Sequence, residues 1–306
     1  MNSIKKMLKR ITFSKKQESR RMGAIYQKQP MFHPIENKEQ GDFRKRDLEQ
    51  YFRPSCLPVL NTRISDFQFF NPYFEKTEIK LPPSMMDSPE TTILNYFSIL
   101  REAENLTSKQ IGGCGTVGMA RIPFPVAYNF FTKEYQKKVS YPAYLKSFEG
   151  IGHTNLIKLK AIPDKDIPTY FFELETIEGS NKDLTYFAYY YGYISVKKEQ
   201  NLYKIADVKL YGEDFLCAAY HLWQHNAEAV VEIKYGQWCK MIKKQLPTKQ
   251  EGYVKTIEII GTDGMDYQFV FFQLTNDTDI LISQLKRNPK GKWESVHIDP
   301  QKCIND

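Results

Sequence analysis

The sequence predicts an α+β protein made of two tandem modules, each with helices that precede an antiparallel sheet. The first observation is a change of period: apolar residues recur at helical spacing before Gly152 and at every second position after it. The second is a series of four alternating segments, separated by turn-forming residues, which is typical of a meander of strands. The third is that a helix followed by four strands returns late in the chain. Helices that precede such a meander are expected to pack on one face of its curved sheet.

The first module begins with a helix whose start is well marked at residues 87–90, Asp-Ser-Pro-Glu. Ser88 is a good N-cap, and the proline and glutamate after it suit the first helical turn. Apolar residues at helical spacing then predict a helix over 89–105. Two shorter helices are expected, one from Val126 and one over 141–148.

The sheet of the first module is predicted from period-two alternation. Its third strand carries aromatic side chains on both faces, so we expect both faces to be covered. The helices would cover one face, and either the second half of the chain or another subunit would cover the other. The predicted strands span 153–162, 169–178, 184–197 and 202–211.

The second module repeats this order in a shorter form. A helix is predicted over 226–244, and four alternating segments follow it. In each half, the last two strands have the same pattern: a basic strand end, a polar turn, an aromatic residue and a final alternating strand. This similarity suggests two related modules. The predicted strands span 253–261, 266–275, 278–287 and 292–299.

Changes in composition and the positions of prolines divide the chain further. Hydrophobic residues make up 42% of it, which is enough for real cores and excludes wholesale disorder. The polar first segment is expected to be a disordered leader. The next segment is rich in proline and aromatic residues, and we interpret it as an extended arm that packs over the folded body or serves a partner. The predicted divisions are 1–50, 51–84, 85–212 and 213–306.

The formal charge of +7 is concentrated in the leader. Residues 1–28 hold nine basic residues and one acidic residue, whereas the rest holds 34 basic and 35 acidic residues. Four apolar residues near the start fall on one helical face, with basic residues mostly off it. This pattern fits a frayed terminus, an anionic membrane surface or phosphate contacts, and the neutral body disfavours a dedicated nucleic-acid protein. The basic residues are Lys5, Lys6, Lys9 and Arg10.

Cysteine usage predicts a reducing compartment. The five cysteines are few, odd in number and scattered, unlike a disulfide framework. The basic N-terminus lacks the apolar region of a secretory signal, and no run of 18 apolar residues occurs. We therefore expect a cytoplasmic protein that is able to contact a membrane peripherally through its leader.

The order of elements resembles the NTF2-like superfamily. The resemblance rests on the helix PETTILNYFSILREAENL, the short helices after it and the meander that closes on YKIADVKLYG. It covers 85–212 and, more loosely, 220–300. It implies a sheet bent around helices into a cone with an apolar mouth, and frequent dimerisation through the outer sheet face. Members include isomerases and cyclases but also many non-catalytic modules, so the fold does not decide the activity.

Catalysis in such a cone requires an acid or base with hydrogen-bond donors in a dry interior. The candidates are His153, Glu173 and Glu175 on strands, with Tyr128 or Tyr190 as donors. No Asp–His or Tyr–Asp signature of the isomerases stands at a matching position. Glu173 and Glu175 are interpreted as solvent-facing charges, and we favour a protein that is not an enzyme.

A glycine-rich segment at 113–118 formally fits GxGxxG. A dinucleotide site needs a strand before this motif and a helix after it. Here a helix precedes it, and Pro123 and Pro125 are expected to block a helix after it. Neither a cofactor nor a catalytic role for Cys114 is predicted.

A cluster at i, i+4 and i+8 suggests zinc as an alternative function. Cys217, His221 and His225 would share one helical face, and Cys239 would add a fourth ligand. Paired CxxC or HExxH spacing is absent, which favours ordinary packing and no bound metal.

The leading hypothesis is a non-enzymatic interaction or ligand-binding protein. Its partner would be another protein or a second copy of the chain, bound through the aromatic sheet face or the cone mouth. A small-molecule isomerase or cyclase that uses the first cone is the main alternative, and zinc binding is a second one. The expected ligand- or partner-binding residues are Tyr128, Tyr186, Tyr189, Tyr190 and Tyr191.

Overall fold

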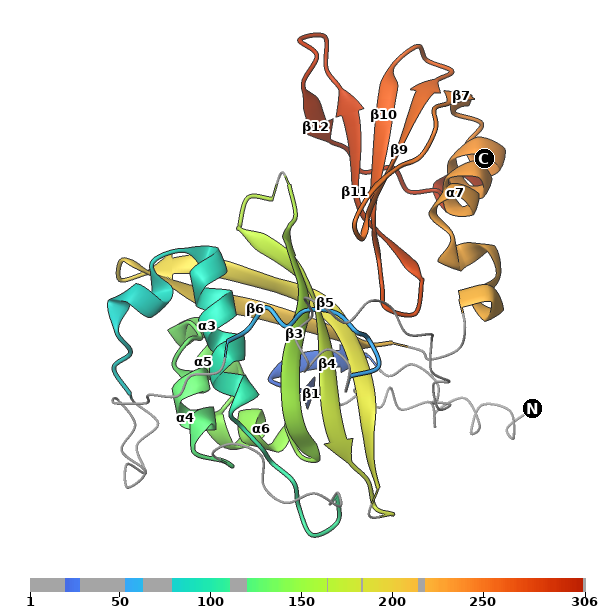
Figure 1. Ribbon diagram of the computed structural model, residues 1–306. Coiled ribbons are helices and arrows are strands. Elements are labelled where there is room, and N and C mark those ends of the chain that lie inside the picture. The colour runs from blue at the N-terminus through green and yellow to red at the C-terminus, as the bar shows by residue number, and fades with distance from the viewer. Residues whose placement is uncertain are drawn as a thin grey trace, which may run out of the picture.

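The protein has two mainly antiparallel sheets, with helices packed beside each (Figure 1). This confirms the predicted α+β class. We call the part of the described chain up to Glu213 the first module and the part from Ala218 on the second module. The structure is a computed structural model, and it describes residues 20–27, 53–62, 79–110, 120–163, 165–182, 184–213 and 218–304.

The first sheet has six strands in the order β1-β2-β6-β5-β4-β3. The predicted meander is present, with strand bounds within two residues of those expected. Strand β2 pairs with β6 in parallel, and every other pair in this sheet is antiparallel. The bounds are β1 Arg20–Arg21, β2 Ala24–Gln27, β3 Ile151–Ala161, β4 Thr169–Gly179, β5 Thr185–Glu199 and β6 Leu202–Gly212.

Residues 20–27 belong to this sheet, so the prediction of a leader over 1–50 is wrong for them. Met22 and Ala24 are buried in the core of the first module. The backbone N–H of Met22 donates to Ser147 O at 2.9 Å, and that of Gly23 donates to Ser147 Oγ at 2.6 Å. These contacts fasten the segment to the helices.

Helix α3, Pro89–Arg101, starts as predicted but ends four residues earlier. Ser88 Oγ accepts the Thr91 N–H at 3.1 Å, which is the expected N-cap. Helix α4, Pro123–Tyr128, begins on a proline, so the prediction that prolines block a helix here is wrong. The first helical turn needs no internal N–H donors and therefore tolerates proline. Two short helices follow, α5 Lys133–Lys138 and α6 Tyr141–Lys146.

The inner face of the first sheet is filled by aromatic side chains from these helices. Tyr96 of α3 makes edge contacts with Phe97, Phe130 and Phe131, and Tyr144 of α6 contacts Phe131. All five residues are at most 3% exposed. Among the described residues, closely packed aromatic rings therefore occupy the interior that the family resemblance assigns to a cone pocket.

The second module has its own sheet in the order β12-β11-β10-β9-β7, with β8 paired to β9. The predicted helix over 226–244 is shorter: α7, Ala227–Val230, continues as a π-helical segment that ends at Trp238. The strands are β7 Ile242–Gln245, β8 Lys249–Glu251, β9 Val254–Gly261, β10 Asp266–Gln273, β11 Asp279–Arg287 and β12 Trp293–Ser295.

Both faces of the first sheet are covered, as its aromatic third strand predicts. The helices α3 to α6 lie on one side of the sheet in Figure 1. On the other side, Phe171 of β4 packs edge-on against Phe272 of β10, with ring centroids 5.0 Å apart. Ile162 and Leu274 complete this buried cluster. The second half of the chain therefore supplies this cover.

Residues 53–62 wrap the free edge of strand β3. The Leu60 N–H donates to Leu156 O at 2.8 Å, and Asn61 Oδ1 accepts the Leu156 N–H at 2.8 Å. Asn61 Nδ2 also reaches Phe97 O of α3 at 2.9 Å. The segment therefore satisfies backbone groups that an edge strand would leave unpaired.

Candidate functional site

Glu173 on β4 is buried at the contact between the two modules. Its side chain is 0% exposed, so the interpretation of a solvent-facing charge is wrong. Lys158 Nζ of β3 lies 2.7 Å from Glu173 Oε2 and donates to Gln273 O of the second module at 2.7 Å. Thr275 donates to Glu173 Oε1 through both its N–H, at 2.9 Å, and its hydroxyl. Glu173 therefore joins the modules through a buried ion pair and hydrogen bonds.

Glu175, two residues further along β4, is equally buried at 0% exposure. Arg53 Nη1 lies 2.7 Å from Glu175 Oε1, and the Tyr189 hydroxyl donates to Glu175 Oε2 at 2.6 Å. Arg53 belongs to the segment that wraps the sheet edge. The prediction for Glu175 fails for the same reason as that for Glu173, because a distant part of the chain covers the outward face.

A pocket of about 160 Å³ lies beside Glu173, between the two modules. We call it the inter-module pocket. Glu213, directly after β6, lines it and is only 4% exposed. Burial, and then the neighbouring Glu173 carboxylate, hold the pKa of Glu213 well above its usual value. The lining residues are Tyr191, Glu213, His221, Gln224, Leu274, Asn276, Thr278 and Ile280.

Three shielded polar atoms of this pocket lack hydrogen-bond partners among the described residues. They are Glu213 Oε1, His221 Nε2 and Thr278 Oγ1. A buried polar atom without a partner costs stability, so three of them in one pocket indicate a place for a bound group.

A second pocket, of about 190 Å³, lies at the end of the first sheet where β3, β4 and β5 meet. We call it the distal pocket. Its walls are largely apolar, with Leu106, Ile177 and Phe187, while Glu104, His153 and Glu178 are buried polar groups in its lining. The full lining is Glu104, Leu106, Gly152, His153, Ile177, Glu178, Gly179, Thr185, Tyr186 and Phe187.

Glu178 is occupied by donors from within the chain. Its Oε1 accepts from the Tyr190 hydroxyl at 2.6 Å and from Thr176 Oγ1 at 3.2 Å. Its Oε2 accepts from the Tyr186 hydroxyl at 3.1 Å and pairs with Arg21 of β1. A carboxylate with four such donors is a poor base for a substrate proton.

The five tyrosines predicted to bind a ligand or partner have different roles. Tyr128, Tyr189 and Tyr190 are at most 6% exposed and hydrogen-bonded within the chain, so they stabilise the fold. Burial, and then the Glu178 carboxylate, raise the pKa of the Tyr190 hydroxyl well above its usual value, which keeps it a donor. Tyr186 lines the distal pocket at 38% exposure, and Tyr191 lines the inter-module pocket.

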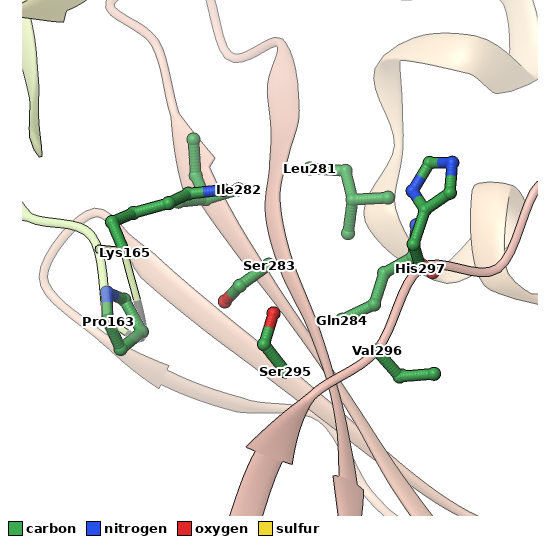
Figure 2. A pocket seen from close by; sticks show the side chains of 9 residues that line it. All are labelled: Pro163, Lys165, Leu281, Ile282, Ser283, Gln284, Ser295, Val296 and His297. Atoms are coloured by element: carbon green, nitrogen blue, oxygen red, sulfur yellow. The ribbon is translucent and has the colours of Figure 1, made fainter. Parts of the chain in front are cut away.

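A third hollow is an open groove of about 330 Å³ on the second sheet, where β11 and β12 diverge. Figure 2 shows Ser283 and Ser295 with their hydroxyls turned toward each other, and Lys165 reaching in from the first module. None of the nine residues that line it is buried. The groove therefore lacks the converging buried groups of a specific site.

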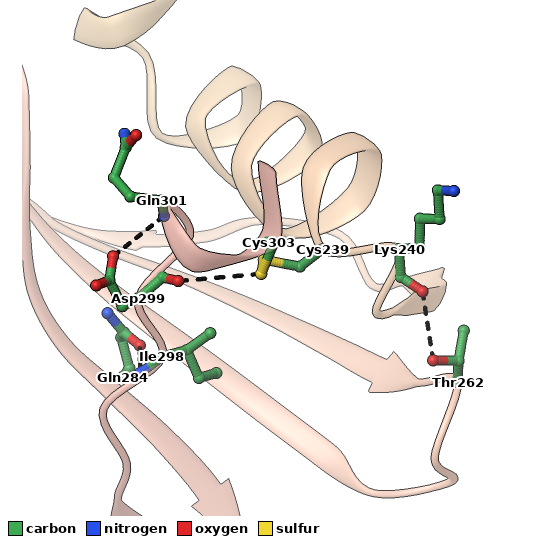
Figure 3. The surroundings of a disulfide bond; sticks show 8 residues. All are labelled: Cys239, Lys240, Thr262, Gln284, Ile298, Asp299, Gln301 and Cys303. Atoms are coloured by element: carbon green, nitrogen blue, oxygen red, sulfur yellow. Dashed lines mark hydrogen bonds between the residues drawn. A yellow bond between two sulfur atoms is a disulfide. The ribbon is translucent and has the colours of Figure 1, made fainter. Parts of the chain in front are cut away.

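The zinc cluster considered as an alternative is not present among the described residues. Leu222 has a positive φ of 55° and breaks the helical turns of 218–225, so His221 and His225 do not share a helical face. Cys239 Sγ is bonded to Cys303 Sγ in a disulfide (Figure 3) and is not free to bind a metal. Cys217, like Cys114, lies outside the described residues. Within the described ranges, no group of three His, Cys, Asp or Glu side chains is placed to hold a metal ion.

The disulfide also corrects the interpretation of the cysteines as a reduced, scattered set. Cys239 follows the π-helical segment, and Cys303 lies in a short turn near the end of the described chain. Their bond ties that turn to the helix across 64 residues of sequence. Such a single long-range pair leaves no spacing pattern in the sequence.

Sequence reasoning missed several residues of both pockets. Glu178 had a usable signal, because it falls on the same side of β4 as Phe172 and Leu174, which face the core. An acid on a core-facing position needs a buried partner. Arg21 and Glu213 had no such signal.

Comparisons with known proteins give no match: no family model, no curated protein and no solved structure matches this chain. Within the described residues, none of the helices has the length and apolar character needed to cross a bilayer. Lys5, Lys6, Lys9 and Arg10 lie outside the described residues.

Proposed function

We propose that the protein is a non-enzymatic binding protein whose distal pocket holds a small molecule with an apolar body and one polar end. The observation that carries this is the combination of apolar walls with the buried His153 at one place in the lining. Ligand pockets typically pair such walls with a few polar groups. An apolar cavity of about 150 Å³ holds benzene, so a pocket of about 190 Å³ has room for a ring with one substituent.

Two observations favour binding over catalysis. The space beneath the sheet, where an isomerase or cyclase would place its substrate, is filled by buried aromatic rings such as Tyr96 and Tyr144. Glu178, one of the two carboxylates in the lining of the distal pocket, has its acceptor positions occupied. A catalytic base needs a free acceptor within reach of the substrate proton.

The experiment is a titration of the full chain with phenol and with toluene, followed by backbone amide shifts. We expect saturable shifts at His153, Ile177 and Phe187, with tighter binding of phenol because of its polar end. Gly152→Val should abolish them, since a Cβ at Gly152 would lie 3.6 Å from Leu106 Cδ2 on the pocket wall.

A second blocking variant and a matched control make the result interpretable. Thr185→Trp should cover the rim of the pocket from an exposed position without disturbing the core. Leu184→Ser changes the neighbouring side chain, which is 64% exposed and does not line the pocket, and should leave binding unchanged. Ligand-induced amide shifts that persist in both blocking variants would refute the proposal.

We also propose that the first module is an NTF2-like domain. The support is a four-strand antiparallel meander with α3 to α6 on one face, in the expected chain order. Dimerisation through the outer sheet face, which the resemblance implies, would have to use surface beyond Phe171, which the second module covers. An experimental structure superposed on known members would test the assignment.

The compartment is proposed from the disulfide. Such bonds are rare in reducing cytosol, so we place the protein in an oxidising compartment rather than in the cytoplasm predicted from the cysteine count. Alkylation of protein taken directly from its source is the test. Cys239 and Cys303 should resist the reagent until a reductant is added, and ready alkylation would restore the cytoplasmic placement.

Peripheral membrane contact through the basic leader remains a proposal supported by its charge and its apolar stripe. Sedimentation with vesicles of phosphatidylcholine and phosphatidylglycerol tests it. The truncated variant should lack residues 1–19 only, because 20–27 belong to the first sheet. Equal recovery of both proteins with the vesicles would refute the contact.

A further inference from the structure

The inter-module pocket has one more carboxyl group than it has basic side chains paired with them among the described residues. Glu173 is paired one-to-one with Lys158, whose Nζ also donates to Gln273 O. Glu213 beside it has no ion-pair partner among the described residues, although it is 4% exposed. A buried carboxylate is stable only when a proton or another cation neutralises it. The pocket of about 160 Å³ next to this carboxyl has room for such a cation.

We propose that the inter-module pocket binds a small organic cation with a primary ammonium group. An ammonium carries three N–H donors and no acceptor. The pocket offers three shielded acceptor atoms without partners among the described residues: Glu213 Oε1, Thr278 Oγ1 and His221 Nε2. The donor and acceptor numbers match, and the ligand charge balances Glu213.

The other walls suit the body of such a cation. The ring of Tyr191 lines the pocket and is stacked on Tyr211, with centroids 5.1 Å apart. An aromatic face attracts a cation that is removed from water. Leu274 and Ile280 provide apolar contacts for a short carbon chain. The volume of about 160 Å³ limits the ligand to a compact amine.

The neighbouring groups also predict the pH dependence of binding. The titratable side chains around Glu213 on the elements that form the pocket are Glu173, Lys158, Tyr189, Tyr191 and His221. Because Glu213 holds a proton more tightly than an ordinary carboxyl, the ammonium must displace that proton. Binding should therefore release a proton and tighten as the pH rises, until the amine itself loses its charge.

The experiment uses the full chain and n-butylammonium, with 1-butanol and butyrate as probes of similar shape. Calorimetric titration at one pH, in two buffers with different ionisation enthalpies, measures both affinity and proton release. We expect saturable binding of butylammonium only, with protons released to the buffer. Equal binding of butanol, or no saturable heat with any probe, would overturn the proposal.

Variants locate the site. Glu213→Gln keeps the shape of the protonated acid, so it should fold, and it should weaken butylammonium binding at least tenfold and abolish proton release. Thr278→Val should weaken binding while leaving proton release intact. Glu232→Gln changes an exposed acid of the second module, outside the pocket lining, and is the control. Unchanged affinity in Glu213→Gln would refute the site, and Gly152→Val, in the distal pocket, should have no effect here.

Discussion

Lys158 and Glu173 form a buried ion pair on neighbouring strands of the first sheet, and each of them also binds the second module. The Nζ–Oε2 distance is 2.7 Å, and the two side chains are 7% and 0% exposed. Lys158 donates to Gln273 O, and Thr275 donates to Glu173. The contact between the modules is therefore polar at this point and apolar around Phe171 and Phe272.

The first prediction concerns this pair. Lys158→Met should lower the free energy of unfolding by about 3–5 kcal/mol, because it leaves the buried Glu173 carboxylate without its cation. Chemical denaturation measures the change. The double variant Lys158→Met/Glu173→Leu should recover most of the loss, since no charge is then left unpaired. Lys138→Met, which removes an exposed pair with Glu134, is the control and should be nearly neutral.

The pair also shows where sequence reasoning succeeds and where it fails. Period-two alternation located the strands well, because each residue's face follows from local backbone geometry. It assigned Glu173 and Glu175 to solvent because they face away from the helices. Arg53 and Thr275 cover that face. Each lies about a hundred residues or more along the chain from the glutamate that it contacts. Alternation along one strand carries no information about such distant cover.

The disulfide and the pockets could not be predicted from the sequence for the same reason. Cys239 and Cys303 meet only because the end of the described chain folds back on the helix. The inter-module pocket joins Glu213, after the first sheet, to Thr278 of the second module. His153 and Tyr186 were identified as candidates from their strands, and the structure does bring them into one pocket.

The second prediction concerns the disulfide. Cys303→Ser should lower the stability of the second module by roughly 2–4 kcal/mol, because the bond closes a loop of 64 residues and restricts the unfolded chain. Thermal unfolding with and without reductant measures this. Reductant should reproduce the loss in the natural sequence and have no effect on the variant. Cys56→Ser, at an exposed free cysteine, is the control.

The third prediction concerns Gly192 in the middle of β5. A Cβ there would lie 2.0 Å from Lys209 O of β6 and 2.9 Å from Phe172 Cζ. Gly192→Ala should therefore cost about 1–3 kcal/mol, because backbone and ring must both move. Chemical denaturation again measures it. Gly152→Ala, whose nearest neighbour would be 3.4 Å away, is the matched control, and an equal cost in both variants would contradict the steric argument.

The last prediction concerns the pH dependence of stability at Glu213. Its pKa is raised above the ordinary value of 4.5 in the folded protein by burial and by Glu173, so the folded state binds this proton more tightly than the unfolded state. In that case stability falls as the pH rises above 4.5, until the folded carboxyl also ionises. Glu213→Gln cannot ionise, so it should lack this loss.

The difference in unfolding free energy between Glu213→Gln and the natural sequence isolates this group, because other titrations cancel. We expect the variant to gain relative stability as the pH increases from 4.5 toward neutrality, measured by urea unfolding at several pH values without added amine. Glu232→Gln, at an exposed acid, should show no such trend. A difference that stays flat, or that favours the natural sequence at neutral pH, would mean that Glu213 is neutralised by a cation within the chain.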